Sequence, residues 1–328
     1  MKLIGLEEHF WTPEIVAALD RLPPAQHDDA MDLFKTPQLL DRLRDLGEDR
    51  LRQMDLIGLD MMVLSVTTPG TQALPPAEAV PLARQANDRL AATIRAHPDR
   101  FAGFATLPTP DPAAAVVELQ RAVQELGLRG AMLHGRTGDK YLDHPDFRPL
   151  LAMAEQLGVP LYLHPQVPPR AVRAVYYDGF GDALSNAFAL GGWGWHLDAG
   201  IGALRLILAG TFDAHPGLQV ILGHWGEMVP FFLERADVMT PLLPGLKKSV
   251  AEYFRQQFYV TPSGIYNTTY LQRAIEVMGV DRVLYSTDYP FQYQPDGTAR
   301  HFLEQAPLSF DDKAKIAHLN AEKLLKLT

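Results

Sequence analysis

The stretch KLIGLEEHF, residues 2–10, begins as a short apolar run and ends in polar side chains. Glu7 and His9 are two residues apart, and side chains with this spacing point to the same face of a β-strand, whereas Glu8 points to the other face. Charged side chains are seldom buried unless they are paired. A carboxylate and an imidazole at the end of an apolar strand therefore raise the question of a metal site.

Seven more apolar runs of this kind follow along the chain. Most are nearly continuous in apolar residues, which is typical of strands buried on both faces of a parallel sheet. Helical patterns such as residues 113–127 separate them. This alternation predicts an α/β protein with a (β/α)8 TIM-barrel fold. The predicted strands are residues 2–10, 61–67, 101–108, 130–135, 160–165, 218–224, 258–262 and 282–290.

Two stretches of the chain contain more residues than the loops of a plain barrel need. Residues 11–57 are polar with a helical pattern, and residues 166–200 are rich in proline, glycine and aromatic side chains. They follow predicted strands 1 and 5, so we expect helical insertions over the active-site face. The aromatic insertion fits either a subunit interface, which favours a homo-oligomer (dimer or tetramer), or a wall that stacks on an aromatic substrate. Barrels of this length are often single domains, so we predict one domain over residues 1–328.

The amino-acid composition excludes several kinds of partner and of catalytic site. The net charge of −9 and the lack of a basic patch argue against nucleic acid and anionic membranes as partners. The chain has no cysteine, which removes disulfides, thiolate metal sites and cysteine nucleophiles. Any metal must be held by His, Asp and Glu, which suits zinc, manganese or iron. With no signal-peptide pattern and no apolar run long enough to span a bilayer, we expect a cytoplasmic protein.

Ligand-type side chains stand at the ends of predicted strands 1, 5 and 8. Each has a structural explanation when it is considered alone, because single histidines are often buried for packing and aspartates often cap turns. In a barrel, however, the carboxyl ends of all strands meet at one face. The pattern therefore predicts one divalent-metal site. The predicted ligands are Glu7, His9, His164 and Asp288.

Several segments resemble the decarboxylases of the amidohydrolase superfamily, over the whole chain. These are the E-x-H of strand 1, LYLHP (161–165), TFDAHPGLQVILGHWGE (211–227) and LYSTDYPF (284–291). The chain is most similar to the γ-resorcylate (2,6-dihydroxybenzoate) decarboxylase branch, and more distantly to aminocarboxymuconate semialdehyde decarboxylase. The GHxGE and STDxPF patterns are the specific parts.

The resemblance implies a role for each matching residue. Glu7, His9, His164 and Asp288 match the family's metal ligands. Asp288 would also handle a proton, His224 would be a catalytic or supporting histidine, and Glu227 would orient it. Arg235 matches an arginine near a substrate site shared with a neighbouring subunit. His134, at the end of strand 4, would touch substrate or metal, although a structural role is equally open because the family pattern does not require a histidine there.

Two departures from the hydrolytic members point to the reaction. Glu7 stands where they commonly carry a histidine, and GAMLHG (130–135) lacks the bridging lysine of binuclear members. We therefore expect one Mn²⁺ or Zn²⁺ ion and non-oxidative decarboxylation of a 2-hydroxybenzoate-type acid, with Asp288 protonating the ring carbon. The main alternative is a mononuclear hydrolase of a lactone, ester or amide. A hydratase and a binding protein without turnover are lesser alternatives. With no P-loop and no GxGxxG, we expect no organic cofactor.

Overall fold

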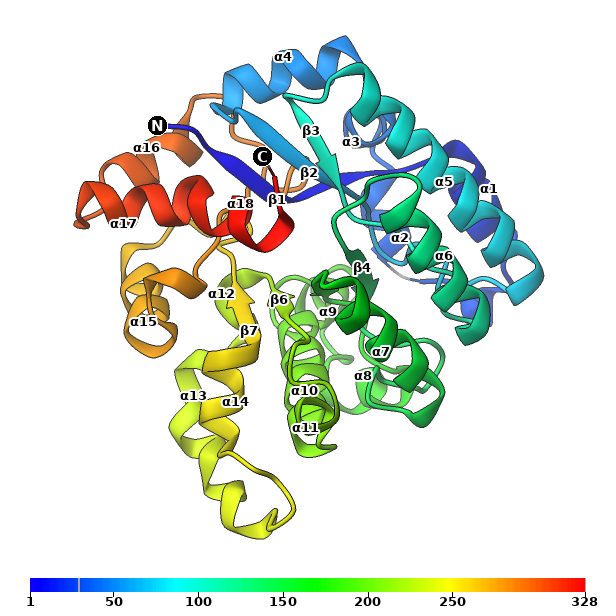
Figure 1. Ribbon diagram of the computed structural model, residues 1–328. Coiled ribbons are helices and arrows are strands. Elements are labelled where there is room, and N and C mark those ends of the chain that lie inside the picture. The colour runs from blue at the N-terminus through cyan, green and yellow to red at the C-terminus, as the bar shows by residue number, and fades with distance from the viewer. Residues whose placement is uncertain (29, 328) are drawn as a thin grey trace.

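The computed structural model describes residues 1–28 and 30–327 and forms a ring of parallel strands surrounded by helices (Figure 1). The regular strands form two parallel sheets, in the orders β1-β2-β3 and β4-β5-β6-β7. Their bounds are β1 Ile4–Phe10, β2 Met61–Val66, β3 Phe101–Gly103, β4 Ala131–His134, β5 Leu161–His164, β6 Val220–Leu222 and β7 Phe258–Val260.

Single bridges join the two sheets into one ring. Ala105, just after β3, pairs with Ala131 of β4. On the other side, residues 282–290 fill the gap between β7 and β1, and Val283 in this segment pairs with Val260. The predicted (β/α)8 barrel is therefore confirmed. All seven regular strands are shorter than the predicted runs, and the difference is largest at residues 101–108, where only Phe101–Gly103 is a strand.

The predicted eighth strand, residues 282–290, is wrong as a regular strand. Its last contact with β1 is a single bridge between Tyr289 and Glu8. The carboxylate of Glu8 accepts hydrogen bonds from the backbone N–H groups of Thr287 and Tyr289, at 2.8 and 3.3 Å. A side chain thus takes the place of ladder partners, and Asp288 between them has a left-handed backbone with φ of 58°. As predicted, Glu8 faces away from Glu7.

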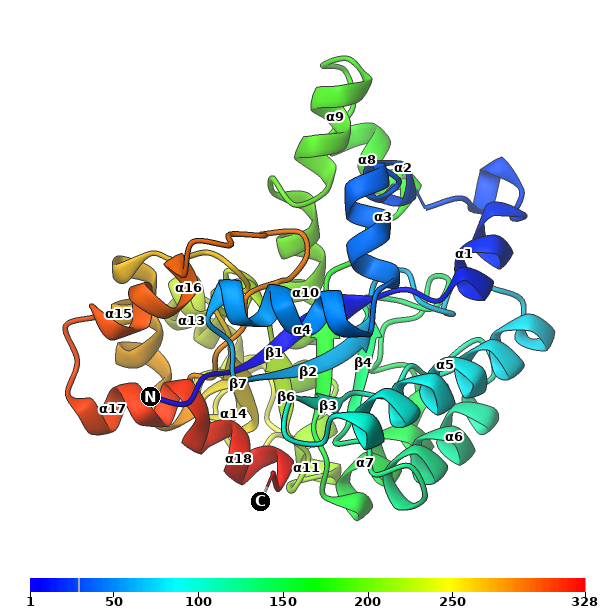
Figure 2. The ribbon, with the colours of Figure 1, turned by 90° about the horizontal axis from the view of Figure 1, so that it is seen from above.

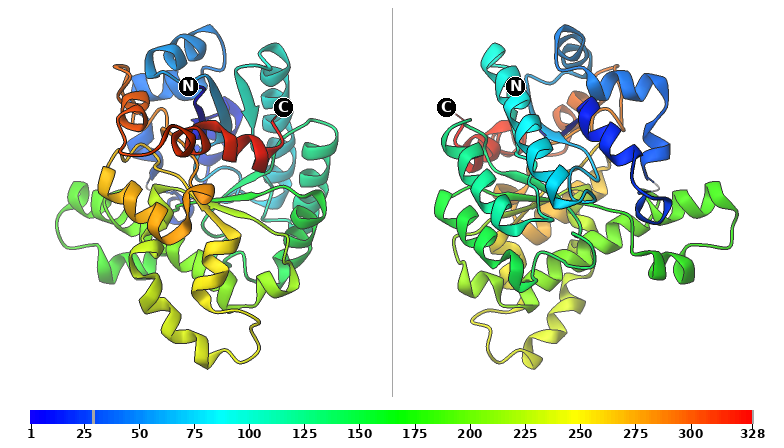
Figure 3. Two further views of the ribbon diagram at one scale, coloured as in Figure 1. Left: turned by 60° about the vertical axis from the view of Figure 1, so that its left-hand side comes forward. Right: turned by 90° about the vertical axis from the view of Figure 1, so that its right-hand side faces the viewer.

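Both predicted insertions are helical. In Figure 2, the helices of the second insertion rise away from the barrel, and α2 and α3 lie on the same side; the right-hand view of Figure 3 shows the same projection from the side. The first insertion contains α1 Pro13–Asp20, the 3-10 turn Pro24–Gln26, α2 Ala30–Phe34, α3 Pro37–Arg44 and α4 Glu48–Ile57. The second contains α8 Arg170–Tyr176, α9 Asp182–Ala189 and the start of α10 Gly194–Leu208.

The other helices surround the barrel. The last helical segment consists of α17 Phe310–Ala314, a π-turn over Lys315–Leu319, and α18 Asn320–Leu325. In the described part of the chain, no helix combines the length and the apolar character needed to cross a membrane. The helix bounds are α5 Pro76–Ala96, α6 Pro112–Gln124, α7 Arg148–Leu157, α11 Thr211–Ala214, α12 His224–Glu227, α13 Val229–Ala236, α14 Val250–Gln257, α15 Thr268–Met278, α16 Thr298–Glu304, α17 Phe310–Ala314 and α18 Asn320–Leu325.

The barrel interior is a packed apolar layer. Burying an apolar side chain of this size contributes about 1.5–3 kcal/mol, so this layer stabilises the barrel. Tyr162 belongs to the layer, yet its hydroxyl reaches the carboxylate of Glu7 at 2.6 Å. The main interior residues are Ile4, Leu6, Met61, Val63, Ala102, Phe104, Met132, Tyr162, Ile221 and Leu284.

Candidate active site

The structure brings together the four predicted metal ligands at the carboxyl ends of β1, β5 and the segment 282–290. One nitrogen or oxygen from each of Glu7, His9, His164 and Asp288 lies within 4.8 Å of the others, and all four residues are buried. Nε2 of His9 is 3.4 Å from Oδ1 of Asp288, and Nε2 of His164 is 3.4 Å from Oε1 of Glu7. The four side chains thus surround one small space.

Two of the atoms that face this space lack hydrogen bonds. Oε1 of Glu7 and Nε2 of His9 are buried and have no partner among the described residues. An unpaired buried polar atom costs about 1–3 kcal/mol, and a cation between the ligands would remove that cost. Two imidazoles and two carboxylates are ligands that Mn²⁺ and Zn²⁺ accept. The residues present therefore fit the divalent ion that the sequence predicts.

Local contacts fix the orientation of Glu7. Its Oε2 accepts hydrogen bonds from the hydroxyls of Tyr162 and Ser263, which leaves Oε1 to face His164. Gly223 packs against the same carboxylate, since a Cβ at that position would lie 2.9 Å from Oε2 and 2.8 Å from Oγ of Ser263. The glycine of the GHWGE segment thus gives Glu7 the space it needs.

Burial and neighbouring charges set the ionisation of the cluster. Burial lowers the pKa values of His9 and His164 to about 4, which keeps these imidazoles in the neutral form that binds metals. Burial alone would raise the pKa of Glu7, but the nearby His224, His164 and His9 hold it below its ordinary value. Burial, followed by repulsion from Glu7, raises the pKa of Asp288 to about 8. Asp288 thus has the character of an acid that carries a proton near neutral pH.

His224 and Glu227 form a second polar pair beside the cluster. They lie on a tight turn after β6, in which His224, Trp225, Gly226, Glu227 and Met228 all have positive φ. Nδ1 of His224 is 2.8 Å from Oε1 of Glu227. Burial opposes charge on both groups, yet their mutual attraction outweighs it. The pKa of His224 rises to about 10, and that of Glu227 falls to about 2. The pair is therefore an imidazolium and a carboxylate.

His196 is a site residue that sequence reasoning missed. Its Nδ1 lies 2.7 Å from Oε2 of Glu227, the oxygen that His224 does not use. His196 belongs to α10 in the aromatic insertion, and the rule that active-site groups stand at strand ends does not apply to it. The only available signal was a histidine among the tryptophans of WGWHLD (193–198).

The two residues predicted to bind substrate, His134 and Arg235, lie in different parts of the structure. His134 ends β4 and is buried beside the cluster, with its ring centre 5.2 Å from that of His164. Neither of its ring nitrogens has a hydrogen-bond partner among the described residues. Arg235 on α13 is exposed and is not among the residues that line the cavity over the cluster. Its predicted role at a shared subunit site remains a prediction.

A cavity of about 310 Å³ lies over the ligand cluster. Both insertions contribute to its walls, and three aromatic rings stand close together there. Phe34 of the first insertion lies 4.6 Å from Phe291 and 6.2 Å from Trp195, measured between ring centres. The cavity is lined by Phe34, Thr68, His164, Leu190, Gly191, Trp195, His196, His224, Ile265, Asp288, Phe291 and Gln292.

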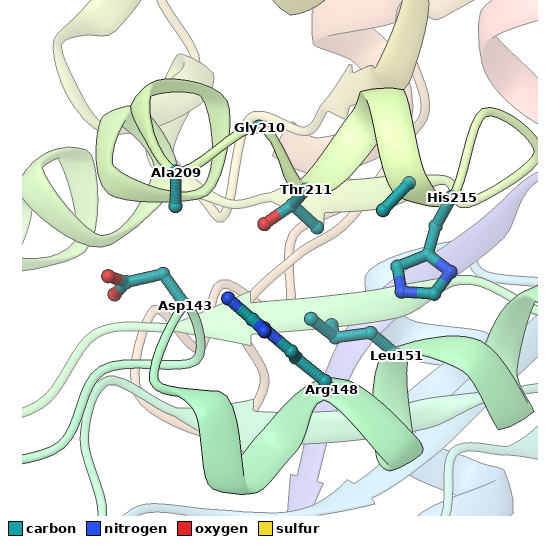
Figure 4. A pocket seen from close by; sticks show the side chains of 8 residues that line it. Asp143, Arg148, Leu151, Ala209, Gly210, Thr211 and His215 are labelled. Atoms are coloured by element: carbon teal, nitrogen blue, oxygen red, sulfur yellow. The ribbon is translucent and has the colours of Figure 1, made fainter.

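A second cavity of similar volume lies between α7 and the α10–α11 turn (Figure 4). Its acidic residue Asp143 is already paired with Arg205 at 2.8 Å, and its histidine, His215, lies 3.1 Å from Glu155. None of the predicted metal ligands lines it. The cavity over the metal-type cluster is therefore the candidate active site.

We expect the substitution His224→Ala to lower kcat about 10²–10³-fold, because it removes a charged group at the cavity wall. His215→Ala is the matched control, since it also removes a histidine paired with a glutamate, but far from the cluster. We expect the control to change kcat by no more than about twofold. Steady-state kinetics of the two variants would check this, and equal small losses would assign His224 a purely structural role.

Several known proteins with a similar sequence and fold are decarboxylases. The γ-resorcylate decarboxylase of Rhizobium radiobacter is 39% identical over 337 residues, covering 99% of this chain and 98% of that protein. The structure of 5-carboxyvanillate decarboxylase from Sphingomonas paucimobilis matches with a TM-score of 0.90 and 36% identity, over 100% of this chain and 99% of that one. A dihydroxybenzoic acid decarboxylase from Polaromonas, with bound manganese and the inhibitor 2-nitroresorcinol, matches with a TM-score of 0.86 and 36% identity, over 99% and 97%.

The amidohydrolase family model matches residues 9–327, nearly the whole chain. The segments with the predicted metal ligands, the GHWGE turn and both insertions lie within this match or directly before it. The chain therefore belongs to the amidohydrolase family.

Proposed function

We propose that this protein is a metal-dependent, non-oxidative decarboxylase of hydroxylated aromatic acids of the 2-hydroxybenzoate type, such as 2,6-dihydroxybenzoate. One observation carries the proposal: Asp288 lies with Glu7, His9 and His164 in a buried ligand cluster that borders a cavity with aromatic walls. The decarboxylase relatives support the same reaction and argue against the hydrolase alternative.

In this proposal, Glu7, His9, His164 and Asp288 hold one divalent ion. Manganese is the first choice because the Polaromonas relative binds it, and zinc remains an alternative that the same ligand types accept. When bound, the ion supplies positive charge that neutralises the carboxylate and ortho-phenolate of the substrate.

The residues of the chain then carry out the proton chemistry. The aromatic walls hold the ring so that the carbon bearing the carboxylate faces Asp288. Asp288 donates its proton to this carbon, which interrupts the aromatic system. The bond to the carboxylate then breaks, its electron pair restores the aromatic ring, and CO₂ leaves. Asp288 regains a proton from water before the next turnover. His224, as an imidazolium held by Glu227, stabilises negative charge on the substrate.

The cavity suits a hydroxylated ring. Phe34, Trp195 and Phe291 provide faces and edges that pack against an aromatic substrate. Thr68 is 1% exposed, lines the cavity, and its hydroxyl has no partner among the described residues, so it is free to bind a ring hydroxyl. We propose that His134, buried beside His164, supports this ligand without lining the cavity.

We also propose a homo-oligomer, a dimer or tetramer. The projecting helices α8 and α9 and the loop between them carry exposed apolar side chains, among them Val175 (77% exposed), Tyr176 (65%) and Phe180 (60%). Exposed apolar patches of this kind are typical of protein interfaces. Arg235 would then act at a neighbouring subunit's site. We further propose a single domain over residues 1–328 and a cytoplasmic location. Limited proteolysis would test the domain organisation, and cell fractionation would test the location.

The test is a screen of hydroxybenzoates for CO₂ release, with the protein loaded separately with manganese and zinc. We expect CO₂ and resorcinol from 2,6-dihydroxybenzoate, and the reverse carboxylation of resorcinol with excess bicarbonate. A nitrophenyl ester and a lactone serve as hydrolase substrates in the same assay. Turnover of these without CO₂ release from any hydroxybenzoate would replace the proposal with the hydrolase alternative.

A further inference from the structure

We propose that His196 is a positioning residue, which fixes the Glu227 carboxylate and through it the ring of His224. This inference rests on the proposed function, because the purpose of positioning His224 is decarboxylation. His196 matches none of the residues that the family resemblance assigned, and it reaches the site from a helix of the insertion.

The Glu227 carboxylate is held from both sides. Its Oε1 accepts a hydrogen bond from Nδ1 of His224 at 2.8 Å, and its Oε2 accepts one from Nδ1 of His196 at 2.7 Å. Glu227 is 1% exposed, so water does not compete for these oxygens. Two bonds to two different oxygens fix the rotation of the carboxylate, whereas one bond alone would let it turn. His196 therefore determines the direction in which Glu227 holds His224.

His196 is itself anchored. Its Nε2 lies 3.1 Å from the carbonyl oxygen of Gly191, so each ring nitrogen lies within hydrogen-bond distance of an oxygen. The ring centres of His196 and His224 are 4.7 Å apart. Since every hydrogen-bonding position of His196 is used by Glu227 or by the turn before α10, its ring has one well-defined orientation.

The turn before α10 is built to place this histidine. A Cβ at Gly192 would lie 2.5 Å from the carbonyl oxygen of Ala187, and one at Gly194 would lie 2.2 Å from that of Ala189. Distances under 3 Å to backbone atoms are not tolerated, so this close approach of α9 and α10 requires glycine. The glycines thus allow α10 to start close enough to the site for His196 to reach Glu227.

This contact couples the insertion to the catalytic turn. Trp195, the neighbour of His196, forms part of the aromatic wall of the cavity. The same helix start therefore carries one residue that contacts the substrate ring and one that holds the partner of His224. A displacement of this segment would change the aromatic wall and the orientation of His224 together.

The test compares His196→Ala with His196→Asn, because the Asn side-chain N–H₂ occupies nearly the position of Nδ1–H and donates to Glu227. We expect the Ala variant to lower kcat about 10-fold or more, as is usual when the partner that orients a site residue is removed, with little change in KM. The Asn variant should restore most of the lost kcat. His215→Ala, which removes a histidine bonded to Glu155, is the control and should match the unaltered protein.

A second measurement does not depend on turnover. In zinc-loaded protein labelled with ¹⁵N-histidine, we expect the ring resonances of His224 to shift in the Ala variant and to return toward their original positions in the Asn variant. Unchanged His224 resonances and kcat in His196→Ala would overturn the inference, as would an Asn variant that is folded but as impaired as Ala. Binding of a second metal equivalent that requires His196 would also overturn it. If the unaltered protein turned over no hydroxybenzoate, the proposed function would fail, while the resonances would still test the positioning.

Discussion

Replacing Asp288 by asparagine is expected to lower kcat for CO₂ release by about 10²–10⁴-fold, the usual contribution of a positioned general acid. The carboxyl group combines burial, a pKa raised to about 8 and a place 3.4 Å from His9 in the ligand cluster. Asparagine has nearly the same shape and still offers an oxygen, but it has no proton of suitable acidity to give. The reaction would then lack its proton source although the site keeps its form.

The kinetics should be measured at saturating manganese, with bound metal determined in the same samples, so that loss of the ion is separated from loss of the acid. Asp143→Asn is a suitable control, since that aspartate pairs with Arg205 on the outside of the barrel. A metal-loaded Asp288→Asn variant with activity near that of the original protein would exclude Asp288 as the proton donor.

The substitution Glu7→Gln is expected to weaken metal binding by more than about 100-fold, since changes to groups that only support the ligands already cost 10–100-fold. Tyr162 and Ser263 both donate to Oε2 of Glu7. An amide cannot satisfy these two donors and also present an anionic oxygen to the ion. The affinity for manganese should be measured by calorimetry on metal-free protein.

Glu155→Gln provides the matched control for this measurement. The Glu155 carboxylate accepts a hydrogen bond from the backbone N–H of Gly217 and lies 3.1 Å from Nδ1 of His215, so its contacts are outside the ligand cluster. We expect Glu155→Gln to retain manganese affinity, and an equal loss in both variants would refute a specific ligand role for Glu7.

Sequence reasoning predicted most of the fold because buried parallel strands are short continuous apolar runs, and such runs are visible without a structure. Its error at residues 282–290 has a physical cause. The segment reads as a strand, but the side chain of Glu8 binds its backbone and turns Asp288 into a left-handed conformation. A pairing between a side chain and a distant backbone segment leaves no local signal in the sequence.

In the candidate site, too, some residues were visible from the strand pattern and others were not. The convergence of Glu7, His9, His164 and Asp288 was predictable because strand ends meet at one face of a barrel. His196 was not, because its place depends on how α10 packs against the turn after β6. The hydroxyl of Thr68, which has no partner in the described part of the chain, was also not predictable, since an isolated threonine after a strand carries no pattern. Loop and helix residues reach the site through packing, which the strand pattern does not describe.

The most direct test of the account is a titration of metal-free protein with manganese while CO₂ release from 2,6-dihydroxybenzoate is followed. We expect no activity without metal, a linear rise, and a plateau at about one ion per chain, the number that the buried cluster of Glu7, His9, His164 and Asp288 is built to hold. Full activity in the metal-free protein, or a rise that continues to two ions per chain, would contradict a single-metal decarboxylase.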